Sequence, residues 1–378
     1  MTEFIAFFSD FTLRNVALGA ALLGITSGIL GSFTLLRQQS LLGDALSHAA
    51  LPGVALGFII SGSRSLLPIM IGALISAAAA AILMTLIINR SRLKTDAALG
   101  IVLSTFFAFG LVLLTYIGHQ NNAGQAGLNT FLFGQAASIL PSDVWVMFAV
   151  TLISILLLSV FWKEFKIVTF DRDFAASLGF NVLGLELTMT IMIALAIVIG
   201  LQMVGVVLMA SMLIAPAAAA RQWVKTLEHM ILVSALFGAL SGLIGALISA
   251  TSTGLATGPL IVIAASIIVF ISLLFAPKRG LLKEALNRRK NNKQLRQDHI
   301  LLALYNLAKE HNDPEYKSEI GMIKSFYHHD PSKLLKDLES QGLVHTVEHM
   351  KEEGKHWVLS NKGYQDAEQI WQDIGGSQ

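Results

Sequence analysis

Residues 41–53 are LLGDALSHAALPG, an apolar stretch that holds one carboxylate and one imidazole, those of Asp44 and His48. The two residues are four positions apart, so on a helix their side chains lie one above the other on the same face. Asp44 fits the start of a helix at the membrane interface, whereas His48 lies a full turn deeper. Because an ionisable group in hydrocarbon is costly, such groups normally mark an ion path, a proton relay or a structural pair.

The spacing alone leaves these three roles open. Carboxylate and imidazole ligands suit Mn²⁺, Fe²⁺, Zn²⁺ and Co²⁺. Two ligands are too few to hold a metal, but a second subunit that brings the same pair across an interface would supply the others. The structural alternative is an Asp44–His48 hydrogen bond, or a helix cap beside a lone buried histidine. Apart from this pair and residues near loop ends, the apolar segments are almost free of ionisable groups.

The composition of the whole chain is that of a membrane protein. Of its 378 residues, 54% are hydrophobic and 14% are charged, whereas soluble domains carry about 25% charged residues. The charges are unevenly distributed, with 21 in residues 1–276 and 31 in residues 277–378. We therefore predict a transmembrane domain (1–276), a basic juxtamembrane linker (277–294) and a soluble domain (295–378). The absence of cysteine excludes disulfides and thiolate metal sites.

Nine segments are apolar and approach the length of about 20 residues that a spanning helix needs. They are Leu13–Leu36, Asp44–Ser61, Leu66–Ile88, Ala97–Ile117, Val144–Phe161, Leu187–Gln202, Val204–Ala220, His229–Ala250 and Pro259–Phe275. The sixth and seventh are short and nearly continuous, so they form either a tight hairpin or one broken helix, and eight spans are the alternative. Thr130–Leu140 is apolar but too short to span.

The loop charges predict the orientation of the chain in the membrane. With nine spans, nine of the 11 Lys and Arg residues of the membrane part fall on one side, and only Arg14 and Arg64 fall on the other. Cytoplasmic loops are enriched in Lys and Arg. We therefore expect an N-terminus outside the cell and a cytoplasmic C-terminal domain.

Residues 36–56, LRQQSLLGDALSHAALPGVAL, resemble the second-helix motif of the manganese/zinc/iron permeases of ABC importers. VGVVL at 204–208 and LIAPAAAA at 213–220 resemble the late glycine–proline segment of that family, so the resemblance covers about residues 10–276. It implies an all-α, type II importer-like permease with about nine transmembrane helices. It also implies that Asp44 and His48 coordinate the transported metal, with Mn²⁺ favoured and Zn²⁺ or Fe²⁺ as alternatives.

The same resemblance implies partners. Members of the family work as dimers of permeases, bound to two cytoplasmic ABC ATPase subunits and fed by an extracytoplasmic metal-binding protein. This chain has no phosphate-binding loop of the G-x-x-x-x-G-K-[ST] type. We therefore expect a transport subunit in the cell membrane that is not itself an enzyme and holds no permanent cofactor. Whether the second permease is identical or a homologue stays open.

Val168–Asn181 is the longest loop on the predicted cytoplasmic side of the membrane part, and it resembles the segment with which the family docks on its ATPase. Phe174, Ala175 and Leu178 have helical spacing after Asp171, and Gly179 is a suitable helix stop. We predict that these five residues form an ATPase-coupling element. The alternative is an ordinary interfacial helix.

The C-terminal domain resembles a winged helix, similar to the N-terminal module of metal-dependent repressors of the diphtheria-toxin-repressor type. Its expected elements are helices at His299–His311, Ser318–Tyr327 and Pro331–Gln341, strands at Gly342–His345 and His356–Leu359, and a closing helix at Gly363–Ile370. Residues 295–378 carry 9 Lys and Arg against 14 Asp and Glu. Since DNA readers need a basic face, we expect no nucleic-acid binding.

Two other functions compete with metal import. The chain could be a membrane-tethered, metal-responsive regulator whose output is the C-terminal domain. It could also be an ABC permease for a chelated metal or cobalamin, which needs a wide polar channel rather than a pair of ligands for a bare ion.

Overall fold

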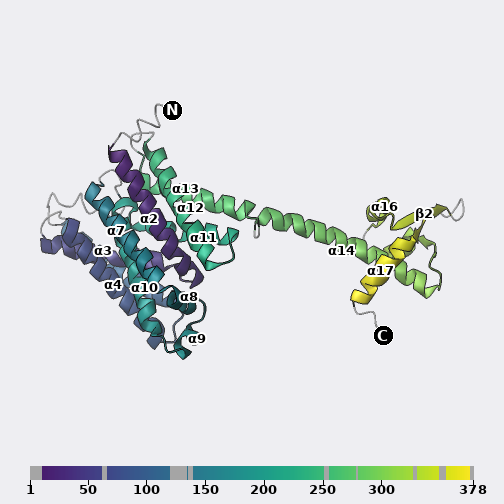
Figure 1. Cartoon of the computed structure of the whole chain (residues 1–378), viewed down its shortest axis with the longest axis horizontal. Coiled ribbons are helices and arrows are strands. Elements are labelled where there is room, and N and C mark those ends of the chain that lie inside the picture. Colours follow the sequence, from purple (N-terminus) through teal and green to yellow (C-terminus); the bar gives the residue numbers. More distant parts are fainter. Residues whose placement is uncertain are drawn as a thin grey trace. The chain divides into compact units, whose positions relative to one another are not determined.

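The computed structural model describes residues 11–61, 66–119, 134, 139–250, 255–277, 280–326, 330–348 and 355–374. The chain divides into two compact units, Met1–Leu281 and Leu282–Gln378, and each is described by itself (Figure 1). The membrane unit is helical throughout its described part. Its helices are α2 (Phe11–Leu36), α3 (Leu42–Ser61), α4 (Leu66–Arg90), α5 (Thr95–Gly118), α7 (Pro141–Val160), α8 (Trp162–Phe170), α9 (Arg172–Ser177), α10 (Val182–Val204), α11 (Val206–Trp223), α12 (Leu227–Ala250) and α13 (Thr257–Phe275).

Eight helices in the described part are long and apolar enough to cross a membrane, namely α2, α3, α4, α5, α7, α10, α12 and α13. The seventh predicted segment, Val204–Ala220, forms α11, a helix of 18 residues that is not among the eight. It is separate from α10 because Gly205 adopts a φ of 87°, which ends one helix and begins the next. The nine-span topology and the predicted orientation therefore stay predictions. Thr130–Leu140 lies largely outside the described residues.

The sixth predicted segment is longer than its apolar pattern suggests. α10 begins at Val182 rather than Leu187 and has 23 residues, so it is not short. The side chain of Asn181 caps it by accepting a hydrogen bond of 3.0 Å from the Gly184 N–H. As a result, Glu186 lies inside the helix instead of in the preceding loop.

Small residues set the closest helix contacts of the membrane unit. α2 packs along α12, and a Cβ added to Gly24 would lie 2.1 Å from the Gly238 carbonyl oxygen. α3 packs on α4 in the same way, since a Cβ on Gly53 would lie 2.0 Å from the Gly72 carbonyl oxygen. In a bilayer, where apolar surface gains little from helix association, such close backbone contact is a main source of packing energy.

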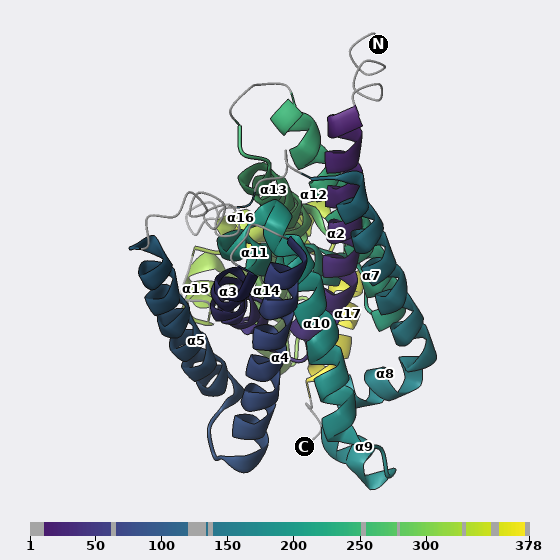
Figure 2. The ribbon, with the colours of Figure 1, turned by 90° about the vertical axis from the view of Figure 1, so that its left-hand side faces the viewer.

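α3 lies inside the bundle and carries the sequence motif analysed above. Figure 2 shows it nearly end-on, with α4 and α5 beside it. It also contacts α10 and α11. Most of its residues are buried, although its C-terminal end exposes Ile59 and Ile60. The motif is therefore held by neighbours on several sides.

The C-terminal unit combines helices with a small antiparallel sheet. Its elements are α14 (Leu281–Glu310), β1 (Ser318–Glu319), α15 (Ile320–Phe326), α16 (Ser332–Ser340), β2 (Val344–Glu348), β3 (Lys355–Leu359) and α17 (Asn361–Asp373), with strand order β1-β3-β2. The predicted start of the second helix at Ser318 is wrong, because Ser318 and Glu319 pair with β3 as a strand. The basic stretch 287–293 is helical, as part of α14. Buried side chains such as Leu304, Leu335 and Trp357 form the core of the unit.

We predict that Gly24→Ala lowers the stability of the membrane unit by about 1–3 kcal/mol, the usual cost of overpacking. The new methyl group meets the α12 backbone, which cannot rotate away as a side chain can. The matched control is Gly100→Ala on α5, where an added Cβ meets nothing within 4 Å. The measurement is the melting temperature of each purified variant in detergent. Equal melting temperatures for the two variants would contradict the proposed packing.

Candidate metal site

Asp44 and His48 lie on one face of α3, as their spacing predicts. The His48 Nε2 atom is 3.3 Å from the Asp44 Oδ1 atom. Asp44 is in the first turn of the helix and its side chain is 36% exposed, whereas the His48 side chain is 18% exposed. The pair thus joins a carboxylate that reaches an open surface to an imidazole that is largely enclosed.

The second nitrogen of His48 has no polar partner among the described residues. Its Nδ1 atom is buried and makes no hydrogen bond there. The ring packs edge-on against Phe107 of α5, with centroids 4.7 Å apart. A buried polar atom without a partner is uncommon and calls for an explanation. Here the apolar packing fixes the ring, so that only the edge carrying Nε2 has a polar neighbour.

Asp44 lines a groove of about 530 Å³ between α3, α11 and α13. Its walls are mainly apolar. The polar side chains that line it besides Asp44 are those of Ser40, Ser211 and Ser266. The remaining lining residues are Leu41, Ala210, Ile214, Ala215, Ala218, Val269 and Phe270. A cation in this groove would find one carboxylate and a few hydroxyl oxygens.

One chain does not assemble a complete metal site from its described residues. Within them, no group of three or more His, Cys, Asp and Glu side chains lies close enough to hold a metal ion. Asp44 and His48 therefore supply two ligands, which is half of the four that a tetrahedral transition-metal site needs. The missing ligands have to come from water, from backbone carbonyls or from another chain.

The predicted coupling segment, Val168–Asn181, contains the end of α8 and the whole of the short helix α9. Asp171 caps α9 by accepting a 2.9 Å hydrogen bond from the Phe174 N–H, and Gly179 follows the helix with a φ of 84°. Ala175 is fully buried, whereas Phe174 and Leu178 are each 53% exposed. The five predicted residues therefore lie together on one small element that presents two large apolar side chains outward.

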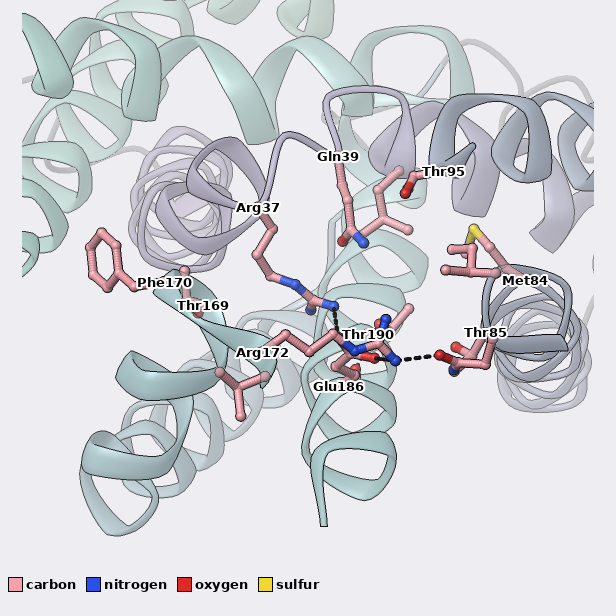
Figure 3. A pocket seen from close by; sticks show the side chains of 14 residues that line it. Arg37, Gln39, Met84, Thr85, Thr95, Thr169, Phe170, Arg172, Glu186 and Thr190 are labelled. Atoms are coloured by element: carbon pink, nitrogen blue, oxygen red, sulfur yellow. Dashed lines mark hydrogen bonds and ion pairs between the residues drawn. The ribbon is translucent and has the colours of Figure 1, made fainter. Parts of the chain in front are cut away.

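A second cluster of charged residues was not predicted from the sequence. Glu186 of α10 lies between two arginines, with its Oε1 3.4 Å from the Arg37 Nη2 and its Oε2 3.3 Å from the Arg172 Nη2 (Figure 3). Arg172 also donates a hydrogen bond to the Asn89 side-chain oxygen. Burial lowers the pKa of Arg37, and the charge of Glu186 opposes that shift.

Glu186 thus adds one ionisable group, near the start of α10, to the few that the apolar helices hold. The predicted segment begins at Leu187 and therefore leaves Glu186 outside it, whereas α10 begins at Val182. Asp143, in the first turn of α7, is also buried and accepts hydrogen bonds from the Leu140 N–H and the Gln202 side chain. The sequence did contain a signal for Glu186, because its carboxylate lies at the predicted cytoplasmic side of the membrane, where Lys and Arg residues such as Arg37 and Arg172 are concentrated.

A bundle of apolar helices that encloses an ionisable pair defines a multi-pass membrane protein of the transporter class. The chain belongs to the ABC 3 transport family, whose model matches residues 9–276. It is 44% identical to the zinc transport system membrane protein TroC of Treponema pallidum over 283 residues, which are 75% of this chain and 95% of TroC. It is 40% identical to the manganese transport system membrane protein MntC of Bacillus subtilis over 351 residues, 92% of this chain and 79% of MntC.

A solved structure has the same fold. The chain is similar to one in the structure of PsaBC from Streptococcus pneumoniae in complex with Fab, with a TM-score of 0.65 and 36% sequence identity. The match covers 75% of this chain and 99% of the solved one. The membrane unit is thus a permease of this family.

We predict that the Asp44 groove is open to water. Since the chain has no cysteine, Ser211→Cys introduces a single thiol into the exposed wall of the groove. This thiol should react with a charged methanethiosulfonate reagent, because the reactive thiolate forms where water reaches it. The control, Ser234→Cys, lies fully buried between α12 and α2 and should not react. If Ser211→Cys stays as unreactive as the buried control, the groove does not offer a water path.

Proposed function

We propose that this chain is the permease subunit of an ABC importer that moves a divalent transition metal into the cytoplasm, powered by a separate ATPase. The observation that carries the proposal is the Asp44–His48 pair on α3. The His48 Nε2 and Asp44 Oδ1 atoms are 3.3 Å apart on a helix whose other side chains are mainly apolar. The family membership of residues 9–276 supports it, and so do the names of TroC and MntC, which are membrane proteins of zinc and manganese transport systems. The comparisons lend no support to the tethered-regulator alternative.

The ligand chemistry favours a borderline or hard metal. Carboxylate and imidazole without thiolate suit Mn²⁺, with Zn²⁺ and Fe²⁺ as competitors. The relatives carry both zinc and manganese in their names. We favour Mn²⁺, because the chain has no cysteine to add a soft ligand.

A second permease, identical or homologous, would complete the site. Each chain supplies two ligands, and the groove between α3, α11 and α13 leaves Asp44 open to a partner or to the transport path. Two such pairs would surround a cation with two carboxylates and two imidazoles. Such a site binds a metal through exchangeable ligands, which a transporter needs in order to release it.

The remaining partners follow from the family. Phe174 and Leu178 on α9 offer an apolar contact for a cytoplasmic ATPase subunit, and an extracytoplasmic metal-binding protein would deliver the ion. The N-terminus would then lie outside and the C-terminal unit in the cytoplasm. We assign that unit to the winged-helix type, supported by its order of helices and strands and by its antiparallel sheet.

We predict that Asp44→Asn and His48→Ala each reduce metal uptake by about tenfold or more, since either change removes a ligand from the path. Each variant is purified with its ATPase, reconstituted in vesicles and assayed for entry of Mn²⁺. The matched controls are Asp96→Asn and His229→Ala, which change exposed residues near the ends of α5 and α12. Uptake at the wild-type rate in both site variants would refute the assignment of Asp44 and His48.

We further predict that removal of residues 282–378 leaves transport intact. TroC aligns with 75% of this chain yet is 95% covered by the alignment, so it has little room for a comparable second unit. The truncated chain ends at the observed boundary between the two units. Uptake by the truncated permease should stay within about twofold of the full chain, as expected where few contacts cross a domain boundary. Complete loss of uptake in a folded truncation would favour an essential role for the C-terminal unit.

A further inference from the structure

The cluster of Arg37, Glu186 and Arg172, here called the Glu186 cluster, joins three separate parts of the membrane unit. Arg37 lies in the connection between α2 and α3, Glu186 lies in α10, and Arg172 begins α9. Figure 3 shows the two guanidinium groups reaching toward the one carboxylate from different elements. Each arginine approaches a different oxygen, at 3.4 Å for Arg37 and 3.3 Å for Arg172. Loss of Glu186 would therefore break both connections at once.

The burial of the cluster argues against a role in stability alone. The side chains of Arg37 and Glu186 are 9% and 10% exposed, whereas that of Arg172 is 43% exposed. Desolvation of a buried ion pair commonly offsets its attraction, so such pairs add little net stability compared with apolar packing. The cluster also holds two positive charges against one negative charge. The electrostatic energy of such a cluster depends strongly on the distances between its three charges, so a small displacement of one side chain changes it.

The backbone on the Arg37 side passes displacement directly to the Asp44 helix. Only residues 37–41 separate α2 from α3, and Asp44 lies in the first turn of α3. The connection is tied by hydrogen bonds of 3.0 Å from the Gln39 N–H to the Thr34 carbonyl and from the Leu42 N–H to the Gln39 carbonyl. A short, hydrogen-bonded turn of this kind does not absorb movement as a long loop does. Movement of Arg37 therefore shifts the start of α3.

The Arg172 side leads to the exposed surface of α9. Phe174, two residues after Arg172, is 53% exposed and belongs to the surface proposed to meet the ATPase. The guanidinium of Arg172 also holds Asn89 at the end of α4. A cavity of about 250 Å³ beside the cluster leaves room for the guanidinium groups to change partners without a clash.

We propose that Glu186 is a positioning residue for transport, which couples displacement of α9 to the start of α3 through Arg172 and Arg37. The inference rests on the proposed function, because it takes α9 as the element that moves with the ATPase. Asp44 lies seven residues after Arg37, so the cluster acts on the metal site from a distance and touches no metal. Packed interfaces with two discrete arrangements are the usual means by which small shifts are passed between sites.

The test measures metal ions imported per ATP hydrolysed by the full permease, reconstituted with its ATPase and supplied with Mn²⁺. Two variants are compared with the wild type: Glu186→Gln, which keeps the shape but removes the charge, and Arg172→Gln, whose half-exposed position tolerates substitution. The control is Glu228→Gln, which makes the same chemical change in the Lys166–Glu228 pair between α8 and α12. In the part of the chain that the structure describes, that pair forms no ion pair with the α2–α3 connection.

We expect both cluster variants to hydrolyse ATP while their ratio of metal to ATP falls about fivefold or more, the range of a typical coupling free energy. The Glu228→Gln ratio should equal that of the wild type. If the ratio of metal to ATP in Arg172→Gln equals that of the wild type, whether or not both rates fall, the inference is overturned and the proposed function stands. If the wild type itself imports no metal, the proposed function fails first, which is a separate and recognisable result.

Discussion

An ionisable group among apolar helices needs polar neighbours, and this constraint applies to the Asp44–His48 pair and to the Glu186 cluster. His48 is held against Phe107 with Asp44 as its polar neighbour, and Glu186 is enclosed by two arginines. The two clusters differ in one respect. The Glu186 cluster is satisfied within the chain, whereas the Asp44–His48 pair leaves one nitrogen without a hydrogen-bond partner among the described residues and one carboxylate facing a groove. The first suits a fixed connection and the second suits a passing cation.

The packing of the bundle places these clusters. Contacts at Gly24, Gly53, Gly72 and Gly238 bring backbones together without side chains between them. They hold α2 against α12 and α3 against α4. Because the connection from α2 to α3 is short, the position of α2 also sets that of Arg37 and of the first turn of α3. Helix packing, the Glu186 cluster and the Asp44 groove thus form one continuous piece of structure.

Much of this architecture could be predicted from the sequence, because apolar length and helical spacing are local properties. The segments around α2, α3, α4 and α5 and the same-face position of Asp44 and His48 required no knowledge of tertiary contacts. The start of α10 was missed because Glu186 interrupts the apolar pattern, although its charge is matched by Arg37, which is far away in the sequence, and by Arg172 of α9. The strand β1 was missed because two residues form it only through pairing with β3. The groove beside Asp44 depends on how α11 and α13 pack, which no local pattern contains.

The account depends most on the claim that Asp44 and His48 hold the metal in transit. Electron–nuclear double resonance of Mn²⁺ added to the purified permease with its ATPase measures this directly, since an imidazole ligand gives a nitrogen coupling on the manganese spectrum. We predict such a coupling in the wild type and its loss in His48→Ala. Manganese that binds without a nitrogen coupling, or a coupling that survives the substitution, would contradict the account.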